Sequence, residues 1–127
     1  MRALAIDYGE KRIGLALTDE EMITAQAYGT LENRGTGEFT DALRDIIHKE
    51  EVETVVIGKP ISMKGVDTDQ TRIVEEVAQH LEKELNRDII RIDERLTSRE
   101  AEAAGATKTN IDEKSAQLIL QSYLEQR

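Results

Sequence analysis

The spacing of apolar residues changes part-way along the chain, and this change most constrains what the chain can fold into. Up to about residue 37, apolar residues alternate with small or polar ones, which is typical of strands. After that point Phe39, Leu43, Ile46 and Ile47 recur at the spacing of one helix face. The predicted strands span residues 2–7, 12–18, 23–31 (the weakest pattern), 52–57 and 88–93. The predicted helices span residues 38–50, 68–86, a short segment between 97 and 105, and 111–126.

This order of elements predicts an α/β fold with a mixed sheet covered by helices. The first three strands follow one another closely enough to form a meander, whereas each of the last two is reached through a helix. In helix 68–86 the residues expected to face the core lie four apart, and they are Ile73, Val77, Leu81 and Leu85. No repeat, low-complexity segment or linker divides the chain, so a single domain over residues 1–127 is expected.

The composition excludes several classes of protein. Hydrophobic residues make up 39% of the chain and charged residues 34%, as in a folded globular domain. No run of about 18 apolar residues is present, so neither membrane insertion nor secretion is expected. Without cysteine the chain has no disulfide framework, thiolate zinc site or cysteine nucleophile. These features fit a cytoplasmic protein.

The net charge of −9 argues against indiscriminate binding to nucleic acid, because such binding depends on many lysines and arginines replacing counterions on phosphates. Any nucleic-acid site must therefore be local. The basic residues that fall in predicted turns and loops are Lys11, Arg12, Lys59, Lys64, Arg95 and Lys108.

Three carboxylates interrupt apolar patterns at places where a ligand can reach them. Asp7 ends the first strand on the face of Ala5, and Glu94 follows the fifth strand on the face of Ile92. Both are expected at the carboxyl edge of the sheet, where open α/β sheets bind ligands. Asp112 lies in the first turn of the last helix, in the direction of the helix's apolar face, so it is expected to point at the sheet.

Each acid also fits a simpler role when it is considered alone. Asp7 precedes a glycine, as aspartates that begin turns often do. Asp112 is favoured by the helix dipole in a first helical turn, and Glu94 fits a solvated surface acid. The convergence of three separate segments on one edge favours a shared site.

Three converging carboxylates repel one another unless a cation lies between them. Oxygen ligands, with no cysteine and no nearby histidine, favour Mg²⁺ or Mn²⁺ over zinc. Two such ions about 4 Å apart are suited to phosphodiester hydrolysis, in which one activates water and the other stabilises the leaving oxygen. The sequence therefore predicts a metal-dependent hydrolase that needs no covalent nucleophile.

Four groups of residues resemble the YqgF (RuvX) family of the RNase H-like superfamily, and they span nearly the whole chain in family order. The matching stretches are 6–9 with 12–14, 56–60 with 63–65, 93–97 with 100–101, and 111–112 with 116 and 119–124. Members of this family are described as Holliday-junction resolvases or pre-16S rRNA nucleases. The resemblance implies an RNase H-like fold with a five-stranded mixed sheet flanked by helices.

The resemblance also implies a metal-dependent nuclease whose acids match Asp7, Glu94 and Asp112. The implied roles are 5′-end processing of pre-16S rRNA in ribosome biogenesis, Holliday-junction resolution in DNA recombination, or both. Departures from the family pattern are small: Ser115 replaces the first of two common alanines, and Lys64 replaces a frequent acid. Nothing in the sequence chooses between RNA and DNA, and the family likeness transfers the fold better than the substrate.

Basic residues near the three acids are the expected contacts to nucleic acid. Arg12 and Arg95 lie within a few residues of a proposed metal ligand and are expected to bind phosphates, with pairing to a nearby acid as the alternative. Lys59 is expected in a loop after a strand that ends at Gly58, where it either closes over substrate or simply connects two elements. Lys108 precedes the last helix and is expected to touch the backbone.

Two other functions fit the sequence less well. The aspartate–glycine turn resembles the first phosphate loop of actin-like ATPases, but those proteins clamp nucleotide between two such domains, and 127 residues supply one. A non-catalytic RNA- or protein-binding module in ribosome maturation is the second alternative. A junction-cutting enzyme is further expected to act as a homodimer, although the sequence indicates no interface.

Overall fold

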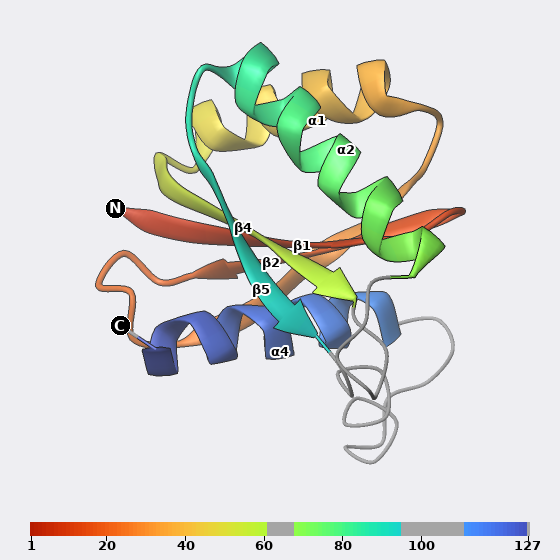
Figure 1. Ribbon diagram of the computed structural model, residues 1–127. Helices are drawn as coiled ribbons and strands as arrows, with labels where there is room; N and C mark the ends of the chain where they lie inside the picture. The colour runs from red at the N-terminus through yellow and green to blue at the C-terminus, as the bar shows by residue number, and fades with distance from the viewer. Residues whose placement is uncertain (61–67, 95–110, 127) are drawn as a thin grey trace.

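The computed structural model describes residues 1–60, 68–94 and 111–126, except the side chains of Ile111 and Asp112 (Figure 1). The strands are β1 (Arg2–Tyr8), β2 (Arg12–Thr18), β3 (Ala25–Glu32), β4 (Val52–Pro60) and β5 (Ile89–Glu94). The helices are α1 (Thr36–Lys49), α2 (Asp69–Leu85) and α4 (Ile111–Gln126). The five strands form one sheet in the order β3-β2-β1-β4-β5.

The sheet is mixed, and β1 lies at its centre. β1 pairs with β2 in antiparallel fashion and with β4 in parallel, while β5 continues the parallel part beyond β4. The carboxyl ends of β1, β4 and β5 therefore point to the same edge, and β2 begins at that edge. This arrangement confirms the predicted fold class.

The two faces of the sheet are built from residues of different size. Strand alternation sends Leu4 and Ile6 to the face covered by α1 and α2, and it sends Ala3 and Ala5 to the face covered by α4 (Figure 1). The face under α4 also includes Ala16, and α4 itself buries small and branched residues against it. Small side chains let a helix lie close to a sheet, so α4 is held near the backbone of the central strands.

Several predicted boundaries and one predicted core residue differ from the structure. β4 does not end at Gly58 but continues to Pro60, because β5 extends the parallel pairing to Pro60 and Glu94. β3 begins at Ala25 instead of residue 23. Ile73 is 45% exposed, because the buried face of α2 is centred on Val74 and Ala78. The predicted short helix between 97 and 105 lies outside the described residues.

No helix in the described part of the chain is both long and apolar enough to span a membrane.

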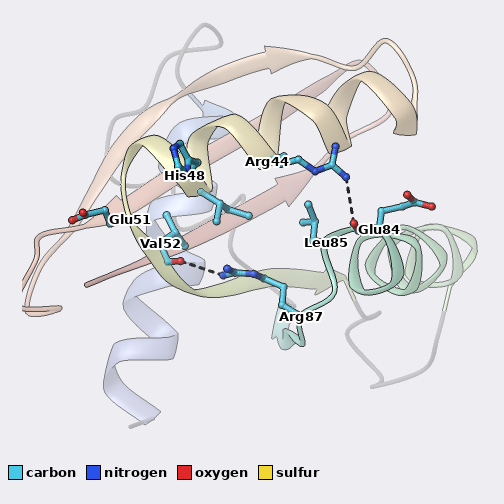
Figure 2. A pocket seen from close by; sticks show the side chains of 8 residues that line it. Arg44, His48, Glu51, Val52, Glu84, Leu85 and Arg87 are labelled. Carbon is cyan, nitrogen blue, oxygen red and sulfur yellow. Dashed lines mark hydrogen bonds between the residues drawn. The ribbon is translucent and has the colours of Figure 1, made fainter.

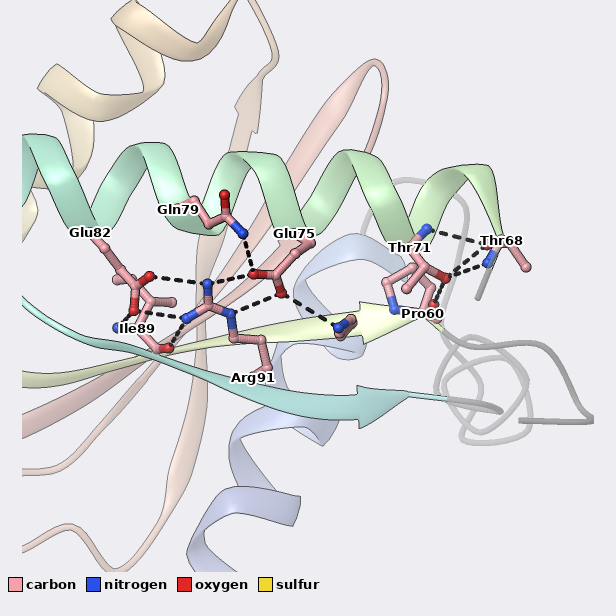
Figure 3. A network of polar contacts seen from close by, with 9 residues as sticks. Pro60, Thr68, Thr71, Glu75, Gln79, Glu82, Ile89 and Arg91 are labelled. Carbon is pink, nitrogen blue, oxygen red and sulfur yellow. Dashed lines mark hydrogen bonds and ion pairs between the residues drawn. The ribbon is translucent and has the colours of Figure 1, made fainter. Parts of the chain in front are cut away.

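A polar network fastens the edge strand β5 to α2 (Figure 3). Arg91 on β5 donates hydrogen bonds to Glu75 and Glu82 on α2, with the shortest N–O distances 2.9 and 2.8 Å. The Arg91 guanidinium lowers the pKa of both carboxyl groups, and Glu82 also accepts from the Ile89 backbone N–H. Among the strands that the structure describes, β5 pairs with β4 alone, so this network helps to fix the strand that ends at Glu94.

Replacing Arg91 with methionine is expected to lower the free energy of unfolding by about 2 kcal/mol at pH 7, because two charge-assisted contacts are lost. Since folding lowers the pKa of Glu75 and Glu82, their contribution is complete above the unfolded value near 4.5 and is lost as the pH falls through the folded value. Urea denaturation at pH 7 and pH 3 should therefore show a difference between wild type and variant that shrinks in acid. An equal difference at both pH values would contradict this account.

The control is Arg34→Met, since Arg34 pairs with Glu32 on the open surface. Little or no change in stability is expected for this variant at either pH.

Candidate functional site

The described acids of the predicted site lie at one edge and on one face of the sheet. Asp7 follows Ala5 by two residues in β1, and Glu94 follows Ile92 by two residues in β5. Ala5 and Ile92 both pack in the cluster beneath α4. Alternation therefore places Asp7 and Glu94 on the α4 face, at the carboxyl ends of two strands separated only by β4. Both residues are partly buried.

Gly58 on β4 makes room for the Glu94 carboxylate. Glu94 pairs with Pro60, yet a Cβ atom added to Gly58, two residues earlier on β4, would collide with Glu94 Oε2 and with the side chain of Ile119 from α4. The carboxylate therefore lies back over β4. Gly58 follows the last pair between β1 and β4, which joins Ile6 to Ile57, so it stands beside Asp7 on the neighbouring strand.

The first turn of α4 lies over the end of the sheet that carries Asp7. Asp7 pairs with Gly14 on β2, and Gly14 pairs with Thr30 on β3. The Thr30 hydroxyl lies 3.4 Å from Glu113 Oε1, which belongs to the start of α4. The beginning of α4 therefore lies at the end of the sheet that carries Asp7, as Figure 1 also shows.

Asp112 precedes Glu113 in this first turn and lies one helical turn before Ala116, which is completely buried against the sheet. The side chain of Asp112 lies outside the described residues, so its predicted role stays a prediction. Among the side chains that are described, no three of histidine, cysteine, aspartate and glutamate form a metal-binding group. The two described acids provide hard oxygen ligands of the kind that Mg²⁺ and Mn²⁺ prefer, and the donor chemistry fits such an ion.

Arg12 is the predicted phosphate contact that the structure places at this edge. It begins β2, is exposed, and lies two residues before Gly14, the partner of Asp7 in the sheet. Alternation puts Arg12 on the α4 face together with Gly14. Asp7 and Arg12 therefore flank one tight turn, in which a Cβ atom added to Gly9 would collide with the Arg12 carbonyl oxygen.

Lys59 does not join this group. It lies within β4 and not in a loop, on the same face as Ile57, which belongs to the cluster beneath α1 and α2. Its Nζ lies 3.5 Å from Glu75 Oε1 on α2. The prediction of a loop lysine was wrong because β4 continues past Gly58. Lys59 thus lies on the opposite face from Asp7.

The predicted contacts Arg95 and Lys108 fall outside the described residues, as does the segment 61–67 that follows Pro60.

A pocket of about 520 Å³ lies at the other end of the sheet (Figure 2). It opens between the carboxyl ends of α1 and α2 and the start of β4, and Val52 in its wall pairs with Arg2 at the start of β1. Its two arginines are bound to backbone oxygens: Arg44 donates to the Glu84 carbonyl and Arg87 to that of Val52 (Figure 2). None of the predicted site residues whose side chains the structure describes lines this pocket.

Sequence reasoning missed Gly58 as part of the site. The available signal was a glycine inside a run of apolar strand residues, which often marks a close approach by another group. The same glycine also fits the end of a strand, and that prediction is wrong here because β4 continues to Pro60. Sequence reasoning also missed the hydrogen bonds from Asn33 and Gln70 to the turn after Asp7, because no local sequence pattern predicts them.

Comparison with known families gives a match over nearly the whole chain. A family model described as RuvX, Holliday junction resolvase, matches residues 1–126. A protein of Maridesulfovibrio salexigens named "Putative pre-16S rRNA nuclease" is 39% identical over 132 residues, which cover 98% of each chain. A protein of Dictyoglomus thermophilum with the same name is 35% identical, over 98% of this chain and 96% of that protein.

Solved structures support the fold. The RuvC protein of T. thermophilus, solved in complex with a Holliday junction substrate, superposes with a TM-score of 0.61 at 10% identity, over 99% of this chain and 96% of that one. The fowlpox virus Holliday junction resolvase superposes with a TM-score of 0.57 at 13% identity, over the full length of both chains. These likenesses confirm the RNase H-like fold.

Proposed function

The chain belongs to the RuvX family, and on that premise we propose that it is a metal-dependent nuclease that cuts precursor 16S ribosomal RNA in the cytoplasm. Family membership makes it a hydrolase of nucleic acids. The matched relatives favour RNA as the substrate, since they are 35–40% identical over nearly the full chain and are named for pre-16S rRNA.

The observation that carries the proposal is the arrangement around Gly58. The Glu94 carboxylate lies over this glycine, which stands beside Asp7 on the neighbouring strand, and the first turn of α4 lies over the same end of the sheet. Neighbouring strands are about 4.8 Å apart, so carboxylates grouped over two or three strands are close enough to share cations. Two acids at this edge match the pattern expected of a two-metal hydrolase.

In the proposed site Asp7, Glu94 and Asp112 hold one or two Mg²⁺ or Mn²⁺ ions. Bound cations of this kind lower the pKa of a coordinated water and neutralise charge on a phosphodiester. Through such an ion Asp7 and Glu94 would hold the scissile phosphate on the α4 face, and Arg12, two residues from the partner of Asp7, would bind a neighbouring phosphate of the same strand. The net charge of −9 disfavours indiscriminate binding of nucleic acid elsewhere on the chain.

The test offers the purified chain four substrates: a pre-16S rRNA fragment that includes the 5′ processing site, a Holliday junction, a linear duplex and single strands. Each is incubated with Mg²⁺, with Mn²⁺ or with EDTA. We expect cleavage of the precursor RNA with either metal and none with EDTA. Size-exclusion chromatography in parallel reports whether the active species is a homodimer, as junction resolution would require.

Each other outcome points to a different function. Cleavage of the junction alone makes the chain a DNA resolvase and rejects the RNA proposal. Binding without cleavage under both metals makes it a non-catalytic module, and cleavage that survives EDTA rejects the metal site. ATP turnover by the same sample would revive the actin-like alternative.

A further inference from the structure

The turn that joins Asp7 to Arg12 is held by side chains from two distant parts of the chain. The Asn33 amide, in the segment between β3 and α1, donates from Nδ2 to the Gly9 carbonyl at 2.8 Å. The Gln70 amide, in the first turn of α2, donates from Nε2 to the Tyr8 carbonyl at 3.3 Å. The carbonyl groups of Tyr8 and Gly9, the two residues after Asp7, are therefore both bound by amide side chains.

Asn33 makes more of these contacts than Gln70 does. Besides its bond to Gly9, its backbone N–H donates to the Lys11 carbonyl at 2.9 Å, and its Oδ1 accepts from the Gly35 backbone N–H at 3.1 Å. One partly buried residue thus binds the turn at two points and is itself oriented by the start of α1. Such a fixed residue limits how far the turn can move.

We propose that Asn33, assisted by Gln70, is a positioning residue that keeps Asp7 and Arg12 at a fixed separation. This inference rests on the proposed function, in which Asp7 holds metal and Arg12 binds a neighbouring phosphate. The turn itself is tight, because Gly9 lies directly against the Arg12 carbonyl. Neither amide touches substrate in this proposal. Each acts through the backbone that carries the two functional side chains.

The sharpest test is Asn33→Asp, which replaces the Nδ2 donor with an oxygen. The backbone bond to Lys11 and the acceptor for Gly35 are kept, while the contact to the Gly9 carbonyl becomes repulsive. We expect kcat to fall about 10-fold with KM changed less than about 2-fold, since small misplacements of reacting groups slow the chemical step. The Mn²⁺ concentration that gives half-maximal activity should rise, and amide hydrogen exchange over residues 8–12 should accelerate.

A matched control is Asn86→Asp, which makes the same chemical and charge change at the far end of α2. Asn86 is exposed and has a left-handed backbone conformation that aspartate also tolerates. The Asn86→Asp variant should retain the wild-type kcat, Mn²⁺ response and amide hydrogen exchange over residues 8–12. Asn33→Ser, which removes the amide donor without adding charge, should lose activity as Asn33→Asp does, and Gln70→Glu should lose about 3-fold because its bond is longer.

The inference is overturned if Asn33→Asp and Asn33→Ser match Asn86→Asp in kcat, Mn²⁺ response and turn exchange. It is also overturned if Asn33→Ser loses activity only in proportion to a lower melting temperature, since that result indicates a merely structural role. Failure of wild type to cut any substrate would instead reject the proposed function. The two failures are therefore distinguished by the activity of the unmodified protein.

Discussion

Asp7→Asn is expected to reduce cleavage at least about 100-fold at saturating Mn²⁺, because it removes a charged oxygen ligand from the centre of the proposed site. The fold should be kept, since asparagine has nearly the same shape and Asp7 is only partly buried. Without metal, the variant should be as stable as wild type or more so, because repulsion between neighbouring carboxylates is relieved. The rise in melting temperature that Mn²⁺ gives to the wild type should disappear.

Asp45→Asn is the matched control for this prediction. Asp45 is exposed on α1, on the other side of the sheet, and the substitution makes the same change in charge. It should leave cleavage and the Mn²⁺ response unchanged. An Asp7→Asn variant that loses stability yet keeps its thermal response to Mn²⁺ would make Asp7 a structural residue and remove the basis of the metal site.

Gly58→Ala is expected to have the second largest effect. Its methyl group would overlap the Glu94 carboxylate and the Ile119 side chain, both of which must move. Added volume in a packed core costs about 1–3 kcal/mol, so unfolding should occur at clearly lower urea. Displacement of Glu94 should also lower kcat by at least about 10-fold, more than the loss of stability alone would cause at a temperature where the variant is fully folded.

The control here is Gly37→Ala, in the first turn of α1. A methyl group at Gly37 meets no atom within 4 Å, and the residue is helical, so alanine should leave stability unchanged or raise it by up to about 1 kcal/mol. Activity should not change. If Gly58→Ala behaves like Gly37→Ala in both stability and kcat, the Glu94 carboxylate does not lie over Gly58 in the working enzyme.

Local patterns were enough to predict the fold, because each strand and helix has its own apolar period. Alternation in β1 and β2 indicated the Ala5 face on which Asp7 lies, and the spacing of Val77 and Leu81 predicted α2. The rotation of α2 was harder to predict. Ile73 and Val74 are adjacent apolar residues, and only packing against the sheet decides that Val74 is buried and Ile73 exposed.

The site was only partly predictable for a related reason. A strand that ends at Gly58, as the sequence predicts, would leave Lys59 and Pro60 in a loop. Pairing with β5, more than thirty residues away in sequence, carries β4 through both and turns Lys59 to the other face. The contacts of Asn33 and Gln70 span 24 and 62 residues, so no short motif reveals them.

The two faces of the sheet differ in how much apolar surface each strand residue buries. Burying an alanine such as Ala3 or Ala5 removes far less apolar area from water than burying Leu4 or Ile6, so the central strand contributes less hydrophobic burial on the α4 side than on the side of α1 and α2. On the proposed function, the face that would bind metal and nucleic acid is the one whose central strands carry small side chains, which lets α4 lie close to the backbone of β1 and Asp7. Substituting Ala3 or Ala5 with a larger residue would therefore push α4 away from the sheet, and with it the first turn that lies over this edge.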